Sequence, residues 1–222
     1  MTDLKGNTFF EGPAGRIEAI LKEPSTPIAR AAVVCHPHPL FGGTMHNKVV
    51  YRIAKAFQGA GFAVLRFNFR GTGHSQGEHD EGRGEQDDLR AAIKFMEEKH
   101  AGAEVWVAGF SFGSAVMLRA ACGDPSIRAL VAAGAPVSKS DLIDVIPCDK
   151  PKLFVQGGLD QFGGAADIAS FVAKLSEPKT LKVIEGADHF FEGHLPELEK
   201  AVSDFINTVM NEERQQGGYS RP

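Results

Sequence analysis

The chain of 222 residues is long enough for one globular domain with a sizeable core, and its 43% hydrophobic and 23% charged residues are typical of a soluble protein. A formal charge of −4 gives no general attraction to nucleic acid or to an anionic membrane, so we expect no nucleic-acid partner. No apolar run approaches the roughly 18 residues of a membrane-spanning helix, and no leader resembles a secretory signal, so we expect no membrane partner.

Two runs of alternating apolar and polar residues open the chain, at residues 8–11 and 16–21, with the turn Gly12-Pro13-Ala14-Gly15 between them. This pattern predicts a half-exposed antiparallel hairpin at the edge of a sheet. The runs that follow are almost entirely apolar, as expected of strands that helices cover on both faces. They occupy residues 31–35, 63–67, 105–108, 129–133, 153–156 and 181–184.

Segments between these runs repeat apolar residues with the 3.6-residue period of a helix. They occupy residues 48–58, 86–100, 165–175 and 196–210. The alternation of strands and helices predicts one α/β domain over residues 1–211, with a mostly parallel sheet, helices on both faces and a ligand site at the carboxyl ends of the strands. We expect residues 212–222 to form a loosely held polar tail.

The segment Gly109-Phe110-Ser111-Phe112-Gly113 stands between a predicted strand and a predicted helix at residues 114–121. A serine in a sharp strand-to-helix turn takes a strained conformation, and glycines on either side remove side chains that would collide there. The start of the helix also offers unpaired N–H groups where an oxyanion would form. This context predicts that Ser111 is a nucleophile and not merely part of a glycine-rich turn.

A serine hydroxyl needs an adjacent base, and the base needs a group that orients it. Asp160 and His189 follow Ser111 in the order that this arrangement requires, each on a loop after a predicted strand. Because the carboxyl ends of parallel strands lie at one edge of a sheet, we predict that Asp160 is the acid and His189 the base. Asp167 and Asp188 are rival acids. Asp167 is expected inside a helix, and Asp188 is too near in sequence to reach the ring of its neighbour His189.

An oxyanion hole needs two N–H donors, one from the residue after the nucleophile and one from the loop after an early strand. The first donor is Phe112. The early loop reads His36-Pro37-His38-Pro39-Leu40, and its prolines have no N–H. The second donor is therefore His38 or Leu40, and we favour His38.

Other features have less specific interpretations. His36, His38 and His46 are close in sequence, but no acidic partner falls at metal-ligand spacing, so we expect no metal. Residues 71–73 form a G-x-G after a strand, but the spacing and acidic residue of a dinucleotide site are missing, so we expect no nucleotide cofactor. Arg70 and the acidic residues 80–85 are expected to be structural, as an arginine paired inside a loop and then a solvated helix entry.

The chain contains three cysteines, Cys35, Cys122 and Cys148. They are odd in number, far apart in sequence and not part of a C-x-x-C motif, so they predict no disulfide framework. Such usage is typical of a reducing compartment, and we expect a cytoplasmic protein.

Several of these motifs together resemble a compact bacterial branch of the α/β-hydrolase superfamily, near the dienelactone hydrolases. The likeness rests on the blocks His36-Pro37-His38-Pro39-Leu40, Gly42-Gly43-Thr44-Met45, Asn47-Lys48-Val49-Val50, Arg66-Phe67-Asn68-Phe69-Arg70-Gly71 and residues 109–113. Other α/β-hydrolases carry His-Gly-x-Pro at the first block, which places His38 at the oxyanion position. Dienelactone hydrolases use cysteine where this chain has Ser111, so their substrate is not expected here.

The resemblance and the residues together imply a single-domain α/β-hydrolase fold with a serine that cleaves carboxylic esters. The expected substrate is a small-molecule ester, hydrolysed through an acyl-enzyme without a metal or an organic cofactor. The same residues would serve hydrolysis of amides, peptides or thioesters, and a binding module without turnover is the non-enzymatic alternative. The sequence indicates neither the physiological substrate nor the oligomeric state.

The connection between the predicted strands at 129–133 and 153–156 bears on substrate size. It has room for one short helix and for no cap domain. An uncovered site predicts a preference for short, water-soluble acyl groups. Leu142, Ile143 and Ile146 of this connection either form one wall of the site or pack on the sheet away from substrate.

Overall fold

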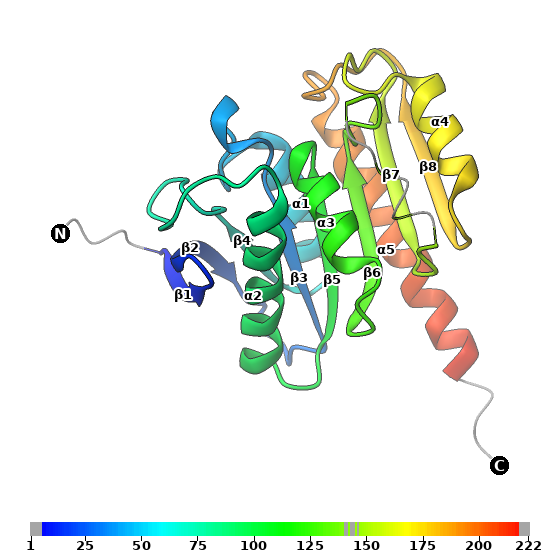
Figure 1. The fold of residues 1–222 in the computed structure, drawn as a ribbon. Coiled ribbons are helices and arrows are strands. Elements are labelled where there is room, and N and C mark those ends of the chain that lie inside the picture. The colour runs from blue at the N-terminus through cyan, green and yellow to red at the C-terminus, as the bar shows by residue number, and fades with distance from the viewer. Residues whose placement is uncertain (1–5, 140–141, 143–144, 146, 218–222) are drawn as a thin grey trace.

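A single sheet of eight strands organises the residues that the computed structural model describes, which are 6–139, 142, 145 and 147–217 (Figure 1). Its strands are β1 (Thr8–Gly12), β2 (Gly15–Lys22), β3 (Arg30–Cys35), β4 (Ala63–Phe67), β5 (Glu104–Phe110), β6 (Ile127–Ala133), β7 (Lys152–Gly157) and β8 (Lys179–Ile184). They are ordered β1-β2-β4-β3-β5-β6-β7-β8. The β1–β2 hairpin and the β2–β4 pair are antiparallel, and all pairs from β4 to β8 are parallel. The predicted mostly parallel sheet with an antiparallel N-terminal hairpin is confirmed.

Helices cover both faces of the sheet (Figure 1). One face packs against α2 (Arg83–Lys99), α3 (Phe112–Ala121) and α4 (Ala165–Lys174), and the other packs against α1 (Lys48–Gly59) and α5 (Leu195–Gly217). Successive residues of a strand point to opposite faces, so Val33 packs on the α2–α4 side and Val34 on the α1–α5 side. This explains the nearly continuous apolar runs. Within the described residues, no helix has both the length and the apolar character of a membrane span.

Two polar segments differ from expectation. Glu85 is completely buried, so the prediction of a solvated helix entry is wrong there. Its carboxylate accepts hydrogen bonds from the N–H groups of Asp80 and Gly82 and thereby starts α2. At the other end of the chain, α5 continues to Gly217, through the first part of the segment predicted to be a loose tail, and Glu213 in this part pairs with Arg30 and Arg128.

Residues 134–151 alone connect β6 to β7. Of the residues expected either to line the site or to pack on the sheet, Leu142 is buried in the same core cluster as the inner faces of α2, α3 and α4. Ile143 and Ile146 lie outside the described residues. For Leu142, therefore, the structure favours packing on the sheet over a wall of the site.

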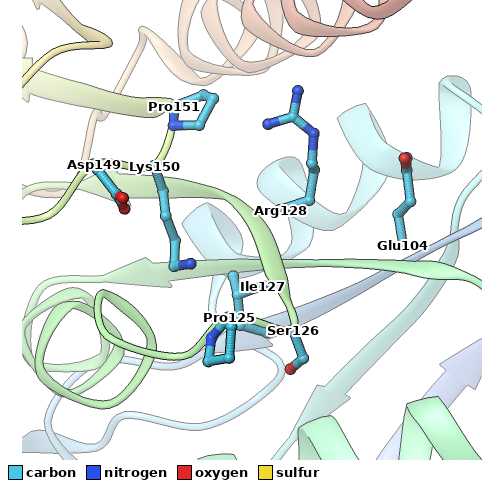
Figure 2. A pocket seen from close by; sticks show the side chains of 8 residues that line it. All are labelled: Glu104, Pro125, Ser126, Ile127, Arg128, Asp149, Lys150 and Pro151. Carbon is cyan, nitrogen blue, oxygen red and sulfur yellow. The ribbon is translucent and has the colours of Figure 1, made fainter.

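A groove lies at the amino ends of β5, β6 and β7 (Figure 2). Its lining comes from the beginnings of these strands and from the segments that precede them, and it consists of Glu104, Pro125, Ser126, Ile127, Arg128, Asp149, Lys150 and Pro151. In open α/β sheets ligands bind at the carboxyl ends of the strands. This groove is thus at the edge opposite to the predicted site.

Arg70, on the loop after β4, is paired with Asp88 of α2. The guanidinium Nη2 lies 2.8 Å from Oδ1 of Asp88, and Nε lies 3.0 Å from Oδ2. The backbone N–H of Arg70 also donates to Oδ2 at 3.0 Å. A side chain at Gly84 would come within 1.9 Å of this guanidinium, so glycine makes room for it. Arg70 is therefore paired, as predicted, but its partner lies on α2 and not inside the loop.

We expect Asp88→Ala to lower the free energy of unfolding by about 3 kcal/mol, because it leaves a largely buried guanidinium without its partner. The neighbouring Asp87 pairs with Arg90 at the exposed surface, and Asp87→Ala should change stability by less than about 0.5 kcal/mol. Urea unfolding of the two variants gives the comparison. Equal losses would show that the Arg70–Asp88 pair does not hold the loop.

Candidate active site

Ser111 lies in a strained turn between β5 and α3. Its φ of 53° and ψ of −122° fall in a region that residues other than glycine rarely adopt. A side-chain carbon at Gly109 would lie 2.4 Å from the carbonyl oxygen of Gly113, and one at Gly113 would lie 2.4 Å from that of His36. Both glycines are therefore required by close backbone packing, as the sequence predicts.

Two hydrogen bonds hold this turn in place. The N–H of Ser111 donates to the carbonyl of Ala133 at the end of β6, at 2.9 Å. The hydroxyl of Ser114, which is completely buried, donates to the carbonyl of Ser111 at 2.6 Å. Ser114 was not singled out from the sequence, although a serine in the first turn of a buried helix needs such a partner.

His189 joins Ser111 to Asp160. Its Nδ1 lies 2.8 Å from Oδ2 of Asp160, and its Nε2 lies 2.9 Å from Oγ of Ser111. A carboxylate only accepts hydrogen bonds, so Nδ1 carries the proton and Nε2 is free to accept from the serine hydroxyl. Asp160 and His189 are both buried, on the loops after β7 and β8. The structure thus brings together the three side chains that the sequence singled out.

Asp160 is itself held by two donors. The N–H of Phe162 donates to Oδ1 and the side-chain amide of Gln156 donates to Oδ2, each at 2.8 Å. Gln156 is completely buried in β7, and the same amide nitrogen donates to the carbonyl of Gly163 at 2.8 Å. Its amide oxygen accepts from the N–H of Ala135 at 3.0 Å. Gln156 therefore fixes the acid relative to the segment after β6.

Gln156 was not predicted from the sequence, although its position carries a signal. Gln156 ends an otherwise apolar run that was predicted to be a buried strand. A buried amide needs hydrogen-bond partners, and a carboxylate a few residues later is a natural one.

The rival acids have other partners. Asp188 accepts hydrogen bonds from the N–H groups of Phe190 and Glu192, both at 3.0 Å, and so shapes the turn after His189. Asp167 lies in the first turn of α4 and accepts from the hydroxyl of Ser138 at 2.9 Å. The geometry therefore selects Asp160 as the carboxylate on His189.

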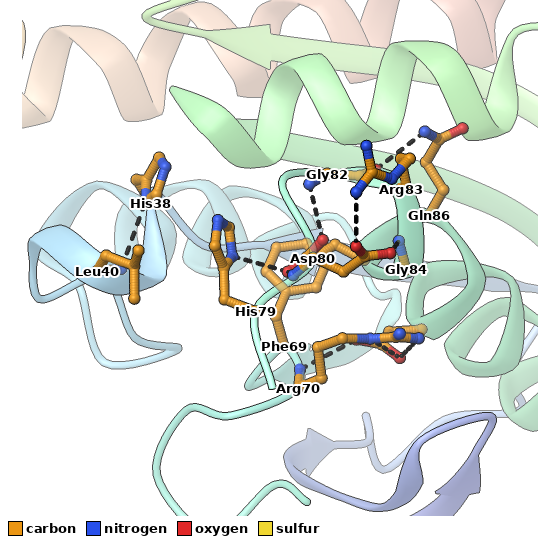
Figure 3. A network of polar contacts seen from close by, with 12 residues as sticks. His38, Leu40, Phe69, Arg70, His79, Asp80, Gly82, Arg83, Gly84 and Gln86 are labelled. Atoms are coloured by element: carbon orange, nitrogen blue, oxygen red, sulfur yellow. Dashed lines mark hydrogen bonds and ion pairs between the residues drawn. The ribbon is translucent and has the colours of Figure 1, made fainter. Parts of the chain in front are cut away.

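The loop from His36 to Leu40 leaves one of its N–H groups available. The N–H of Leu40 donates to Nδ1 of the His38 side chain at 3.3 Å (Figure 3), which engages the second candidate donor. In the described part of the chain, no acceptor pairs with the backbone N–H of His38 or with that of Phe112, which begins α3. These two N–H groups are the ones predicted to bind an oxyanion.

His36 is a structural residue of this loop. The ring is completely buried, its Nε2 accepts from the N–H of Phe69 at 3.0 Å, and its Nδ1 donates to the carbonyl of Pro37 at 2.6 Å. Both ring nitrogens are thus engaged within the protein. Burial lowers the pKa of His36 to about 4, so the ring is neutral at physiological pH. Among the described residues, no three His, Cys, Asp or Glu side chains are grouped as metal ligands would be.

A second histidine lies beside His38. The rings of His38 and His79 are 4.8 Å apart (Figure 3), and the ring of Phe112 is 4.7 Å from His38. Nδ1 of His79 lies 2.8 Å from Oε1 of the buried Glu85. Burial, and then the neighbouring His79, lowers the pKa of His38. His79 was not predicted from the sequence, because only the folded loops bring it against residues 36–40.

Exposed apolar side chains flank the site on two sides. Leu40 and Phe41 are 70% and 86% exposed on the loop after β3, and Leu159 and Phe190 are 69% and 50% exposed on the loops after β7 and β8. The strand order places β5, which ends at Ser111, between these two groups. We call these four residues the apolar rim.

The chain belongs to the α/β-hydrolase fold family, which matches residues 33–147. An uncharacterized protein of Rickettsia prowazekii is 38% identical over 212 residues, which are 91% of this chain and 89% of that protein. The crystal structure of a protein of unknown function from Agrobacterium tumefaciens is 35% identical, with a TM-score of 0.88 over 93% of this chain and 97% of that one. XC6422 of Xanthomonas campestris, described as an α/β serine hydrolase without a lid, is 35% identical, with a TM-score of 0.84 over 91% and 93% of the two chains.

The burial of His36 has a measurable consequence. The folded state keeps His36 neutral down to about pH 4, whereas the unfolded chain takes up this proton near its ordinary pKa of about 6.5. The contribution of neutral His36 to stability is therefore complete above about pH 6.5 and is lost as the pH falls toward about 4.

In His36→Gln, the loss of unfolding free energy between about pH 7 and about pH 4.5 should be smaller than in the wild type by roughly 2 kcal/mol. His46→Gln changes an exposed histidine of the same loop and should follow the wild-type profile. Urea unfolding at a series of pH values measures both. A His36→Gln profile parallel to the wild type would mean that folding does not lower the pKa of His36.

Proposed function

We propose that this protein is a serine hydrolase that cleaves carboxylic esters through an acyl-enzyme. The observation that supports this most strongly is the continuous chain of hydrogen bonds from Asp160 through His189 to Ser111. It ends on a serine in a strained turn at the start of a helix, where activated serine nucleophiles are found. The segment His36-Pro37-His38-Pro39 beside this serine supports placement of the chain in the compact bacterial branch of the family near the dienelactone hydrolases.

In the proposed reaction, Oγ of Ser111 attacks the ester carbonyl carbon while Nε2 of His189 takes the serine proton. Asp160 keeps the ring in the useful tautomer and stabilises the imidazolium that forms. The N–H groups of Phe112 and His38 donate to the oxyanion. His189 then gives its proton to the leaving alcohol, and water, activated by the same base, releases the acid and restores Ser111.

The apolar rim favours, as substrates, small esters that carry apolar groups on both sides of the scissile bond. Leu40 and Phe41 lie on one side of Ser111, and Leu159 and Phe190 lie on the other. An acyl chain and an alcohol that extend in opposite directions from the carbonyl would each cover part of this rim. Because residues 134–151 leave no space for a cap domain, we propose a preference for short, soluble acyl groups.

Replacement of the acid tests the assignment of the triad. We expect Asp160→Asn to lower kcat by about 10⁴-fold, because an asparagine favours the wrong tautomer of His189. Asp167→Asn and Asp188→Asn are matched controls and should retain most activity, since these carboxylates have other partners. Steady-state hydrolysis of a soluble aryl ester measures all three. If Asp188→Asn or Asp167→Asn loses activity and Asp160→Asn does not, Asp160 is not the acid.

A series of esters from acetyl to palmitoyl tests the substrate class. We expect kcat/KM to be highest for the shorter chains, with no jump in rate when a substrate passes its solubility limit. An amide and a thioester of equal acyl length, run alongside, should be cleaved more slowly than the ester. A sharp rise at the solubility limit, or an optimum at the longest chains, would indicate a lid that opens at a lipid surface.

A further inference from the structure

Two histidines form a pair beside the start of α3. His38 lies on the loop after β3 and His79 on the loop between β4 and α2, and their ring centroids are 4.8 Å apart (Figure 3). Both rings pack against the ring of Phe112, at 4.7 Å for His38 and 5.6 Å for His79. Phe112 directly follows Ser111. The histidine pair therefore lies next to the place where we expect the reacting carbonyl.

A buried carboxylate decides which nitrogen of His79 carries the proton. Nδ1 of His79 is buried and lies 2.8 Å from Oε1 of Glu85, at an angle that makes the contact electrostatic and not a hydrogen bond. Glu85 is completely buried, and its two oxygens accept from the N–H groups of Asp80 and Gly82. Because this carboxylate accepts hydrogen bonds and has no proton to give, the proton of the neutral His79 ring lies on Nδ1. Nε2 of His79 is then a hydrogen-bond acceptor.

The ring of His38 has the opposite polarity. Its Nδ1 accepts from the N–H of Leu40 at 3.3 Å. Burial, and then the neighbouring His79, lowers the pKa of His38, so the ring is neutral at physiological pH. Its single proton therefore lies on Nε2, which is a hydrogen-bond donor.

Both Nε2 atoms are open to a ligand. In the described part of the chain neither of them has a hydrogen-bond partner, and neither is among the side-chain atoms that are buried without one. Both nitrogens are therefore accessible. The side chain of His79 is only 12% exposed, so a small group can reach it and a bulky one cannot.

We propose that Nε2 of His38 and Nε2 of His79 together bind a hydroxyl group of the substrate, and that the protein prefers esters of short hydroxy acids. A hydroxyl both donates and accepts, so it can donate to His79 while it accepts from His38. A methylene group in the same place would displace water and leave both nitrogens without a partner, which is costly. This inference rests on the proposed function and names the acyl group for the same site.

The direction of the proposed reaction places the hydroxyl on the acyl group. His189 gives its proton to the leaving alcohol, so the alcohol lies toward the loops after β7 and β8. The histidine pair lies on the other side of Ser111, because β5 separates β3 and β4 from β7 and β8 in the sheet. Since the backbone N–H of His38 also donates to the oxyanion, the hydroxyl belongs close to the carbonyl, on the second or third carbon of the acyl chain.

Ethyl esters of equal acyl length test the preference. Ethyl 2-hydroxybutyrate and ethyl 3-hydroxybutyrate carry the hydroxyl, ethyl butyrate does not, and the release of acid is followed at constant pH. We expect kcat/KM for one of the hydroxy esters to exceed that for ethyl butyrate about tenfold, as one or two well-placed hydrogen bonds would give. In 2-hydroxyethyl butyrate the hydroxyl is on the alcohol, and this ester should show no gain over ethyl butyrate.

Substitution of His79 shows whether the pair is the source of the preference, because the hydroxyl also changes the intrinsic reactivity of the ester. His79→Phe keeps a ring beside Phe112 and His38 but has no lone pair. The ratio of kcat/KM for the hydroxy ester to that for ethyl butyrate should fall about tenfold in this variant. His79→Gln retains a side-chain acceptor and should keep part of the ratio. His74→Gln changes an exposed histidine of the same loop and should keep the whole ratio.

Binding to Ser111→Ala examines the same site without turnover. The proton on Cε1 of His79, assigned by the loss of its NMR signal in His79→Gln, should shift on titration with ethyl 3-hydroxybutyrate and much less with ethyl butyrate. Hydrolysis of neither ester by the wild type would contradict the proposed function, and this titration would still decide the inference.

Three results would overturn the inference while the proposed function stands. The first is an equal ratio of kcat/KM in the wild type and His79→Phe, and the second is a gain from the hydroxyl on the alcohol only. The third is a preference for monoethyl succinate, whose carboxylate only accepts hydrogen bonds and so would require a donor on both histidines.

Discussion

Close backbone packing around Ser111 is the constraint on which the rest of the site depends. Gly109 at the end of β5 lies against the backbone of Gly113 at the start of α3, and Gly113 lies against the carbonyl of His36 after β3. Neither glycine has room for a side-chain carbon. This packing holds the serine in a conformation with positive φ and places its neighbour Phe112 at the start of a helix, with an N–H that pairs with no acceptor in the described part of the chain. One feature thus positions both the proposed nucleophile and a proposed oxyanion donor, and hydrogen bonds from Ser111 and Ser114 balance the strain.

Buried polar side chains on both sides of this turn hold the loop of His38 and the carboxylate of Asp160 in place. On one side, His36 ties the loop of His38 to the N–H of Phe69, and it does so only as a neutral ring. On the other side, Gln156 holds Asp160 against the segment after β6. The site is therefore supported by completely buried polar side chains, which are costly to leave unpaired and so specify one arrangement.

Much of this arrangement could be predicted from the sequence, because the residues concerned carry local signals. The apolar runs predicted the parallel strands. The positions of Ser111, Asp160 and His189 after strand ends predicted that these three residues would lie together. The roles of Gln156, Ser114 and His79 were not predicted, since each depends on partners that only the fold brings close. The burial of Glu85 was missed for a similar reason: the charge of a side chain says little about its position once helices pack on a sheet.

Ser111 is the proposed nucleophile, and covalent labelling tests this role most directly. The protein is treated with a fluorophosphonate, and intact mass and peptide mapping locate the adduct, with His189→Ala as a comparison. We expect a single adduct on Ser111 in the wild type and much slower labelling when the base is removed. No adduct, or an adduct on Ser75 or Ser114 in place of Ser111, would contradict the account.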